Sequence, residues 1–266
     1  MHKLIDTHAL LLAWSRAPWD EAVCGFAVMQ VDQIAVRSAA ARADMQLFEQ
    51  ARDAAGAGLV SCRLLHDRLA ESMLLEACGF RFIEMMYAPH LALAAGDVVD
   101  QASDRDADQA AGQDGALRIV RAGPADMDAI LAVAASAFQH ERFKMDFRLD
   151  ASISDRRFHN WVANTPGHAT QQLYGLYDQQ RLVAFFITEL QADGTCYWHL
   201  NAVAPDAQGQ GYGRRAWRAM LGHARQLGAQ RVRTSVAARN TRVLAMYARL
   251  GFTLPAPSMT FHWVRA

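Results

Sequence analysis

The segment from Leu200 to Arg214 constrains the chain more than any other, because it joins three features that rarely occur together. An apolar run typical of a short strand comes first, glycines at positions 209, 211 and 213 follow, and the next residues are amphipathic. Closely spaced glycines let backbone N–H groups turn toward one point, and a helix that begins there adds unpaired donors and the positive end of its dipole. The segment therefore predicts a strand, a loop and a helix N-terminus that together bind a phosphate group.

The spacing of these glycines excludes two common phosphate loops. In a Walker loop the last glycine precedes a lysine and a hydroxyl residue, whereas Gly213 precedes Arg214. If Gly209 and Gly211 were the first two glycines of a dinucleotide fingerprint, the third would fall at position 214, where an arginine stands. What remains is another kind of phosphate loop or a tight turn from strand to helix.

Composition narrows the class of protein further. The 266 residues are 52% hydrophobic and 20% charged with a formal net charge of zero, so no global field favours nucleic acid or an anionic membrane. The four cysteines lack metal-ligand spacing, and the apolar run from Ala9 to Trp14 is far shorter than the roughly 20 residues that a membrane helix needs. With no leader pattern, we expect a cytoplasmic protein with reduced thiols, no metal, and neither nucleic-acid nor membrane partners.

The first half of the chain has the pattern of a small α/β unit. Strand-like and helical runs alternate at 25–34, 38–55, 59–65, 67–79 and 80–87. His66, Glu71 and Glu84 form no metal or triad spacing and are interpreted as surface or core residues. Six aspartates and no apolar periodicity then indicate a solvated linker. The predicted organisation is a domain at 1–95, an acidic linker at 96–116 and a second domain at 117–266.

The second half begins with a strand and a helix that has Pro124 in its first turn. A polar and aromatic stretch follows, in which Phe158 and Trp161 predict a second helix packed on the sheet. Asp193-Gly194 is a hairpin signal within three consecutive strands that lead into the glycine loop. After the loop come a helix, a strand at 231–236, a helix that begins near Asn240, and a last strand at 259–264.

Two motifs in this half resemble the signatures of the GNAT superfamily of N-acetyltransferases. The first is Gln208-x-x-Gly211-x-Gly213, and the second is a run from Asn240 through Tyr247 to Gly251-Phe252. The resemblance covers roughly residues 117–266 and implies an α/β fold of the α+β type. It has a mixed, mostly antiparallel sheet flanked by helices, with a smaller truncated N-terminal α/β domain of the same kind.

The resemblance implies acetyl-CoA as co-substrate. Its pyrophosphate would lie on the glycine loop, and its pantetheine would pair with a strand edge that splays from its neighbour, as a missing strand would. The implied coenzyme-binding residues are Ala202, Val203, Gln208, Gly209, Gln210, Gly211, Tyr212, Gly213, Arg214 and Asn240.

The resemblance also assigns Tyr247 as the general acid that protonates the leaving thiolate, the alternative being a core tyrosine. A phenol pKa of about 10 against about 8.5 for a thiol allows that transfer when the tetrahedral intermediate collapses. The attacking amine must be neutral, so a base is needed, and Glu189 and His199 on the strands beside the splay are the candidates. Desolvation of the amine is the alternative.

The acceptor is a primary amine whose identity stays open. Within the superfamily, the chain is most similar to the two-domain enzymes of the dTDP-fucosamine acetyltransferase type, which implies a nucleotide-linked amino deoxy sugar that Glu141, Arg142 and Phe143 would bind. Residues 144–147 depart from that type. The alternatives are another small amine, a peptide N-terminus, or a non-catalytic acyl-CoA sensor. The expected partner is a small molecule, and a homodimer is left open.

An internal comparison relates the two halves. Gly79-Phe80 and Gly251-Phe252 both end a helix that leads into an apolar strand, at an offset of 172 residues. At that offset Leu75 replaces Tyr247. The hypothesis is that the first half is a partial copy that lacks the catalytic elements.

Overall fold

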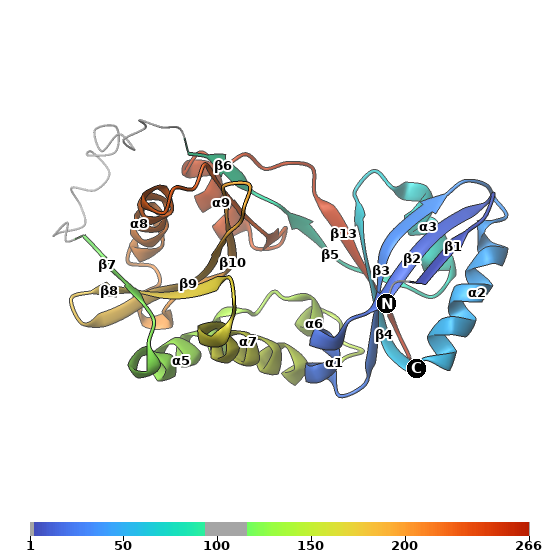
Figure 1. The fold of residues 1–266 in the computed structure, drawn as a ribbon, viewed down its shortest axis with the longest axis horizontal. Coiled ribbons are helices and arrows are strands. Elements are labelled where there is room, and N and C mark those ends of the chain that lie inside the picture. Colours follow the sequence, from blue (N-terminus) through green and yellow to red (C-terminus); the bar gives the residue numbers. More distant parts are fainter. Residues whose placement is uncertain (1–2, 94–115, 266) are drawn as a thin grey trace.

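The computed structural model describes residues 3–93 and 116–265, so the predicted acidic linker lies outside the described residues except for its last position. The strands form two sheets in separate lobes (Figure 1). The first sheet contains, in spatial order, β1 (Lys3–Asp6), β2 (Leu10–Arg16), β3 (Ala27–Val36), β4 (Ala57–Leu65), β13 (Ser258–Val264), β5 (Arg81–Tyr87) and β12 (Val236–Ala237). The second contains β6 (His90–Ala92), β11 (Arg231–Thr234), β10 (Thr195–Val203), β9 (Arg181–Leu190), β8 (Gln171–Asp178) and β7 (Arg118–Arg121).

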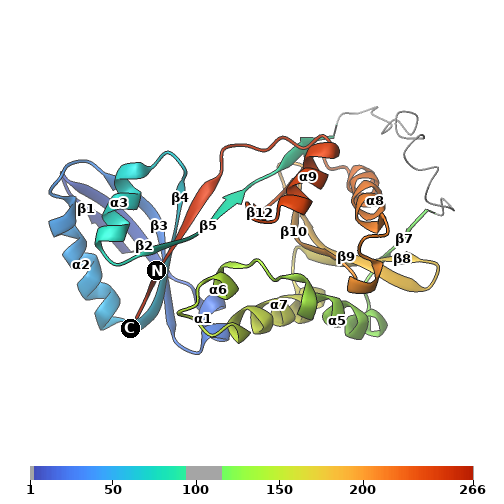
Figure 2. The ribbon, with the colours of Figure 1, turned by 180° about the vertical axis from the view of Figure 1, so that it is seen from behind.

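The two sheets exchange strands. The last strand, β13, lies between β4 and β5 of the first sheet, and β6 from the first half pairs with β11 of the second. Figures 1 and 2 show β5 and β13 running across the middle of the molecule between the lobes. The division at residues 95 and 117 therefore remains a proposal about units of sequence, because each sheet takes strands from both sides of it.

Both lobes repeat one pairing pattern. The meander β1, β2, β3 is antiparallel and β3 pairs in parallel with β4, just as β8, β9 and β10 form a meander and β10 pairs in parallel with β11. The helices that follow correspond as well: α2 (Ala41–Ala54) with α8 (Tyr212–Gln226), and α3 (Leu69–Ala77) with α9 (Thr241–Arg249). Helices α3 and α9 are offset by 172 residues, and each precedes a left-handed glycine, Gly79 or Gly251. The pattern supports the hypothesis of a partial internal copy.

The predicted strand at 231–236 is broken in the structure. Strand β11 ends at Thr234, and the next two-residue strand, β12, pairs with β5 of the other sheet. The chain leaves the second sheet here because the edge of β5 offers Val236 and Ala237 a partner. A second prediction was incomplete: the hairpin of β1 and β2 precedes the first predicted strand.

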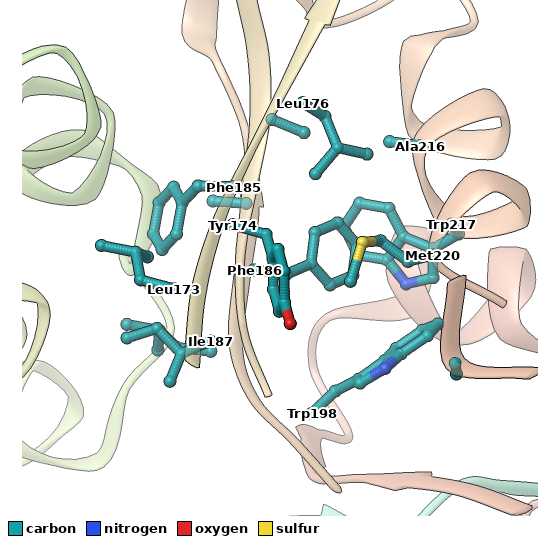
Figure 3. Packing of buried hydrophobic residues seen from close by; sticks show 14 of the residues in the cluster. Leu173, Tyr174, Leu176, Phe185, Phe186, Ile187, Trp198, Ala216, Trp217 and Met220 are labelled. Carbon is teal, nitrogen blue, oxygen red and sulfur yellow. The ribbon is translucent and has the colours of Figure 1, made fainter. Parts of the chain in front are cut away.

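Helices cover both faces of the second sheet, which explains its apolar strands. The helices α5 (Met127–Ala137) and α7 (Ser152–Asn164) lie on one face, and α8 lies on the other (Figure 1). Figure 3 shows Leu173, Phe185 and Ile187 on the α5 side and Phe186 and Trp217 on the α8 side. All three consecutive β9 residues 185–187 are fully buried, each contributing about 1.5–3 kcal/mol to stability.

A buried ionic cluster joins the N-terminal helix α1 (Pro18–Cys24) to the second half. Asp20 is 5% exposed and accepts hydrogen bonds from Arg142 at 2.6 Å and from Arg157 at 3.2 Å. Glu141 lies 3.8 Å from the Arg142 guanidinium and 3.9 Å from that of Arg157. Two acids therefore balance two arginines at this contact.

A second buried cluster fastens β13 to the loop after the short helix α6 (Arg142–Met145). Asp146 accepts two hydrogen bonds of 2.8 Å from Arg148 and one of 3.0 Å from Nδ1 of His262. Burial alone would raise the pKa of Asp146, but the hydrogen bonds from His262 and Arg148 hold it well below its usual range. Burial lowers the pKa of His262 to about 4, so the imidazole is neutral and donates to the carboxylate.

Candidate active site

The parallel pair β10 and β11 separates partway along its length. Their ladder ends at the Trp198 and Thr234 pair, whereas β10 continues to Val203 and pairs there only with β9. From residue 199 to 203 one edge of β10 therefore has no strand beside it in the described part of the chain. Such an edge presents N–H and C=O groups that an extended ligand with amide bonds can pair with.

The glycine loop begins where this open edge ends. Gly209 has φ +78° and Gly211 has φ +83°, a left-handed conformation that other residues adopt only with strain. A Cβ at either position would meet nothing within 4 Å, so backbone conformation, and not space, requires the glycine. Gly211 is the N-cap of α8, whose first N–H groups have no partner within the helix.

Side-chain amides fasten the loop to the strand. Gln208 donates from Nε2 to the carbonyl of Val203 at 3.3 Å, and Gln210 donates to the carbonyl of Asp206 at 2.6 Å. Gly213 lies at the contact between α8 and α9, where an added Cβ would stand 3.5 Å from the sulfur of Met246. Local geometry thus explains Gln208 and Gly211 of the Gln-x-x-Gly-x-Gly pattern, whereas a Cβ at Gly213 would make only an ordinary van der Waals contact.

Tyr212 points its side chain away from the loop. Its hydroxyl donates to Asp178 at 2.6 Å, and the guanidinium of Arg215 lies 3.6 Å from the same carboxylate. The backbone N–H of Tyr212, at the first position of α8, is the group available to an anion at this helix N-terminus.

Tyr247 lies in the core where the two strands separate. The side chain is 1% exposed, and its ring packs edge-on against Phe252 at 4.8 Å between centroids. Burial raises the pKa of the Tyr247 hydroxyl, against the opposing effect of its polar neighbours Trp217, Thr234 and Asn201. Thr234 is the last residue of β11 and Asn201 belongs to the open part of β10. The hydroxyl therefore lies at the apex of the separation and is protonated at neutral pH.

The two candidate bases form a hydrogen-bonded pair. Nε2 of His199 lies 2.8 Å from Oε2 of Glu189. A hydrogen bond from Thr170, followed by the one from His199, lowers the pKa of Glu189, and burial lowers the pKa of His199. An ionised carboxylate only accepts, so neutral His199 carries its proton on Nε2 and a lone pair on Nδ1. The imidazole also packs near Trp161, with 5.9 Å between ring centroids.

The acid and base candidates lie on opposite faces of the sheet. The register of β10 with β9 shifts between Trp198 and Leu200, so His199 is the extra residue. Before the shift, β10 presents Tyr197 beside Glu189, and after it Asn201 pairs with Phe186, which faces α8 (Figure 3). His199 and Glu189 therefore approach the separated strands from the α7 side, and Tyr247 from the α8 and α9 side.

The other predicted site residues make structural contacts. Asn240 caps α9, its side chain accepting from the N–H of Val243 at 3.4 Å. Glu141 likewise caps α6 by accepting from the N–H of Phe143 at 2.9 Å. Arg142 binds Asp20, and Phe143 is fully buried beside His262. The role of Asn240 in coenzyme binding, and that of Glu141, Arg142 and Phe143 in substrate binding, stay predictions.

Metal-ligand groups and membrane-spanning helices are both absent from the described residues. Within 3–93 and 116–265, no three His, Cys, Asp or Glu side chains gather as metal ligands would. Over the same ranges, no helix has the length and apolar composition of a membrane span.

Comparisons with known proteins find similarity in both sequence and fold. A model of the acetyltransferase (GNAT) family matches residues 134–252, and no curated protein matches the sequence. A functionally unknown conserved protein from Staphylococcus epidermidis is similar in structure, with a TM-score of 0.65 at 12% identity over 98% of this chain and 93% of that one. A GCN5-related N-acetyltransferase from Sphaerobacter thermophilus has a TM-score of 0.63 at 13% identity, over 98% and 82% of the two chains.

A third solved structure is described as a tandem GNAT protein from the clavulanic acid biosynthesis pathway. It has a TM-score of 0.57 at 13% identity, over 96% of this chain and 79% of that chain. At these identities the structures show a shared fold, which extends over nearly the whole chain. The family match spans the meander, the glycine loop and α9, and the fold shared with the solved structures extends beyond it on both sides.

Proposed function

We propose that the protein transfers an acetyl group from acetyl-CoA to a primary amine. The observation that carries the proposal is the continuity of the open β10 edge with the glycine loop at the start of α8. The edge suits the amides of pantetheine, the loop suits a pyrophosphate, and the Tyr247 hydroxyl lies at the apex between them. A turn with no ligand would not require an unpaired strand edge beside it.

In this reaction the two proton transfers take place on opposite faces of the second sheet. The amine nitrogen attacks the thioester carbonyl, the C–N bond forms, and the C–S bond breaks to give the N-acetyl amine and the free thiol. On the α7 side, Nδ1 of His199 takes the proton of the ammonium, while Glu189 holds the ring and stabilises the imidazolium. On the α9 side, Tyr247 gives its proton to the leaving sulfur.

A nucleotide-linked amino deoxy sugar is the acceptor that we would test first. The support is the resemblance of the segment around Glu141, Arg142 and Phe143 to enzymes of the dTDP-fucosamine acetyltransferase type, and this segment lies on the α7 side of the sheet, as the base pair does. The assay is thiol release from acetyl-CoA with nucleotide-linked 4-amino deoxysugars, polyamines and peptides. Tight acetyl-CoA binding without turnover of any amine would favour the alternative, a non-catalytic sensor.

Gly211→Val is expected to weaken acetyl-CoA binding by at least about tenfold. A β-branched residue in the left-handed region costs about 1–3 kcal/mol, and relief of this strain would turn the N–H groups of the loop away from the phosphate site. The measurement is the Kd of acetyl-CoA by titration calorimetry. The control is Gly222→Ala within α8, where a Cβ meets nothing within 4 Å, so Kd should stay constant. Equal Kd values for all three proteins would contradict a pyrophosphate role for the loop.

His199→Gln is expected to lower kcat by about 10²-fold or more. A histidine base acts only when neutral, and burial lowers the pKa of His199. Wild-type kcat should therefore hold as pH falls to about 6.5 and decline below that, through the lowered pKa. The variant should lose this acid limb. The control is exposed His159→Gln in α7, which should keep both kcat and its pH profile. An acid limb that persists in His199→Gln would remove the base role.

A further inference from the structure

A row of three polar side chains crosses the first sheet where it faces the second half. Arg63 on β4 is directly opposite Thr260 on β13, and Thr260 is directly opposite Glu84 on β5. Opposed residues of neighbouring strands share a face, and strands lie about 4.8 Å apart, so the row spans about 10 Å. Only the exchange of β13 into this sheet creates it.

Two members of the row are buried without a hydrogen-bond partner. Glu84 is 4% exposed and Thr260 is 1% exposed. Among the described residues, nothing bonds Oε2 of Glu84 or Oγ1 of Thr260. Buried polar atoms in proteins are nearly always paired, and leaving one unpaired costs about 1–3 kcal/mol. The two atoms therefore mark a place where a polar group of another molecule would be held.

Arg63 is a cation of this region with no acid bound to it among the described residues. Arg142 and Arg157 are balanced by Asp20 and Glu141, whereas Arg63 forms no hydrogen bond or ion pair within residues 3–93 and 116–265. Arg63 is exposed to solvent, yet surrounding protein, and then the charge of Arg142, lower its pKa. A guanidinium that solvent can reach and that no acid neutralises can bind an oxyanion strongly.

The row adjoins the proposed catalytic pair. The charges of Arg63 and the Tyr197 hydroxyl influence each other, and the Tyr197 ring lies 4.8 Å from that of His199 between centroids. The charges of Glu141 and Arg142, both in the second half of the chain, act on the carboxyl group of Glu84. Burial, followed by the charge of Glu141, raises the pKa of Glu84 to about 7, so Arg63 does not neutralise its carboxyl group as a bonded partner would.

We infer that Arg63, Thr260 and Glu84 form an acceptor subsite, and that the acceptor is a small primary amine that carries an oxyanion group. Arg63 binds the carboxylate or phosphate of the acceptor, and Glu84 with Thr260 binds a hydroxyl or N–H group of the same molecule. Tyr197 lies between Arg63 and His199, so the reacting amine and the anionic group of the acceptor must be close together in that molecule. The inference rests on the proposed function, and it gives the first half, which lacks a catalytic tyrosine, the task of acceptor selection.

The test uses matched amines with the full-length protein and acetyl-CoA. β-Alanine is compared with propylamine, phosphoethanolamine with ethanolamine, and a nucleotide-linked amino sugar with its free amino sugar. Wild type should show at least about tenfold higher kcat/KM for the anionic member of at least one pair, and the pair that responds tells carboxylate from phosphate.

Two variants locate the anion site. Arg63→Met should remove this preference by raising KM at least about tenfold with kcat nearly unchanged, and Glu84→Gln should raise the KM of the same acceptor. Acetyl-CoA Kd should be unaltered in both. The control is Arg42→Met on helix α2 of the same half, where Arg42 pairs with Glu49 at 3.2 Å and should not affect KM.

The outcomes separate the inference from the function on which it rests. If acetyl-CoA binds and neutral and anionic amines react equally in wild type and in Arg63→Met, the subsite is overturned and the proposed function stands. If acetyl-CoA does not bind, or binds without acetylation of any amine, the proposed function fails and the subsite with it.

Discussion

Tyr247→Phe is expected to lower kcat by about 10²- to 10⁴-fold, the usual effect of removing a general acid, and to leave the Kd of acetyl-CoA within about twofold of wild type. Burial raises the pKa of the hydroxyl, so it is protonated and able to donate across the physiological pH range. Phenylalanine keeps the packing against Phe252 but has no proton to give.

The control for Tyr247→Phe is a second buried tyrosine. Tyr174 on β8 is 7% exposed and packs against His223 on the α8 side of the sheet. Tyr174→Phe removes a hydroxyl from the same core and should not change kcat by more than about twofold. The measurements are steady-state kcat over a range of pH and the calorimetric Kd of acetyl-CoA, for both variants and the wild type. A Tyr247→Phe enzyme with wild-type kcat at every pH would show that the residue is only part of the core.

Asp146→Ala is expected to lower the free energy of unfolding by about 3–5 kcal/mol, because it leaves buried partners of a carboxylate unpaired. Asp146 is 2% exposed and His262 is 0% exposed, so water cannot replace the lost hydrogen bonds at the imidazole. Arg148 would keep its charge and retain only the carbonyl of His262 as a bonded partner, at 3.2 Å. Since the cluster fastens β13 of the first sheet to the loop after α6, the loss should loosen the contact between lobes.

Urea unfolding followed by fluorescence and circular dichroism measures this change. The matched control is Asp150→Ala in the same loop, where the carboxylate is 66% exposed and its contacts are to neighbouring loop and helix residues, so the cost should be below about 1 kcal/mol. Equal midpoints for the two variants would mean that the Asp146 cluster contributes little to the stability of the native state.

The sequence indicated much of the proposed site because its signals are local. The positive φ angles of Gly209 and Gly211 follow from the loop that the glycines must form, and the cap at Asn240 follows from its place before an amphipathic helix. Glu189 and His199 were separate candidates in the sequence. The structure joins them at 2.8 Å beside a bulge at His199, and nothing in the alternation of β10 predicts one extra residue at that place.

Other residues could not be recognised from their neighbours in the chain. Glu84 was interpreted as a surface or core residue, since no motif surrounds it. Its neighbours Thr260 and Arg63 are 176 and 21 positions away, so only strand pairing reveals the row. An acid in a predicted strand of mostly apolar residues was the one available signal.

The sequence by itself determined the elements of this protein and the conformation of its loops, because helix caps, alternation and left-handed glycines depend on residues within a few positions of each other. The tertiary structure decided which strands share a sheet. In the tertiary structure β13 pairs within the first sheet. Strand β11 ends at Thr234, which leaves the rest of the β10 edge without a strand beside it. Such pairings depend on burial and on competition for strand edges between segments far apart in sequence, and no local pattern encodes that competition.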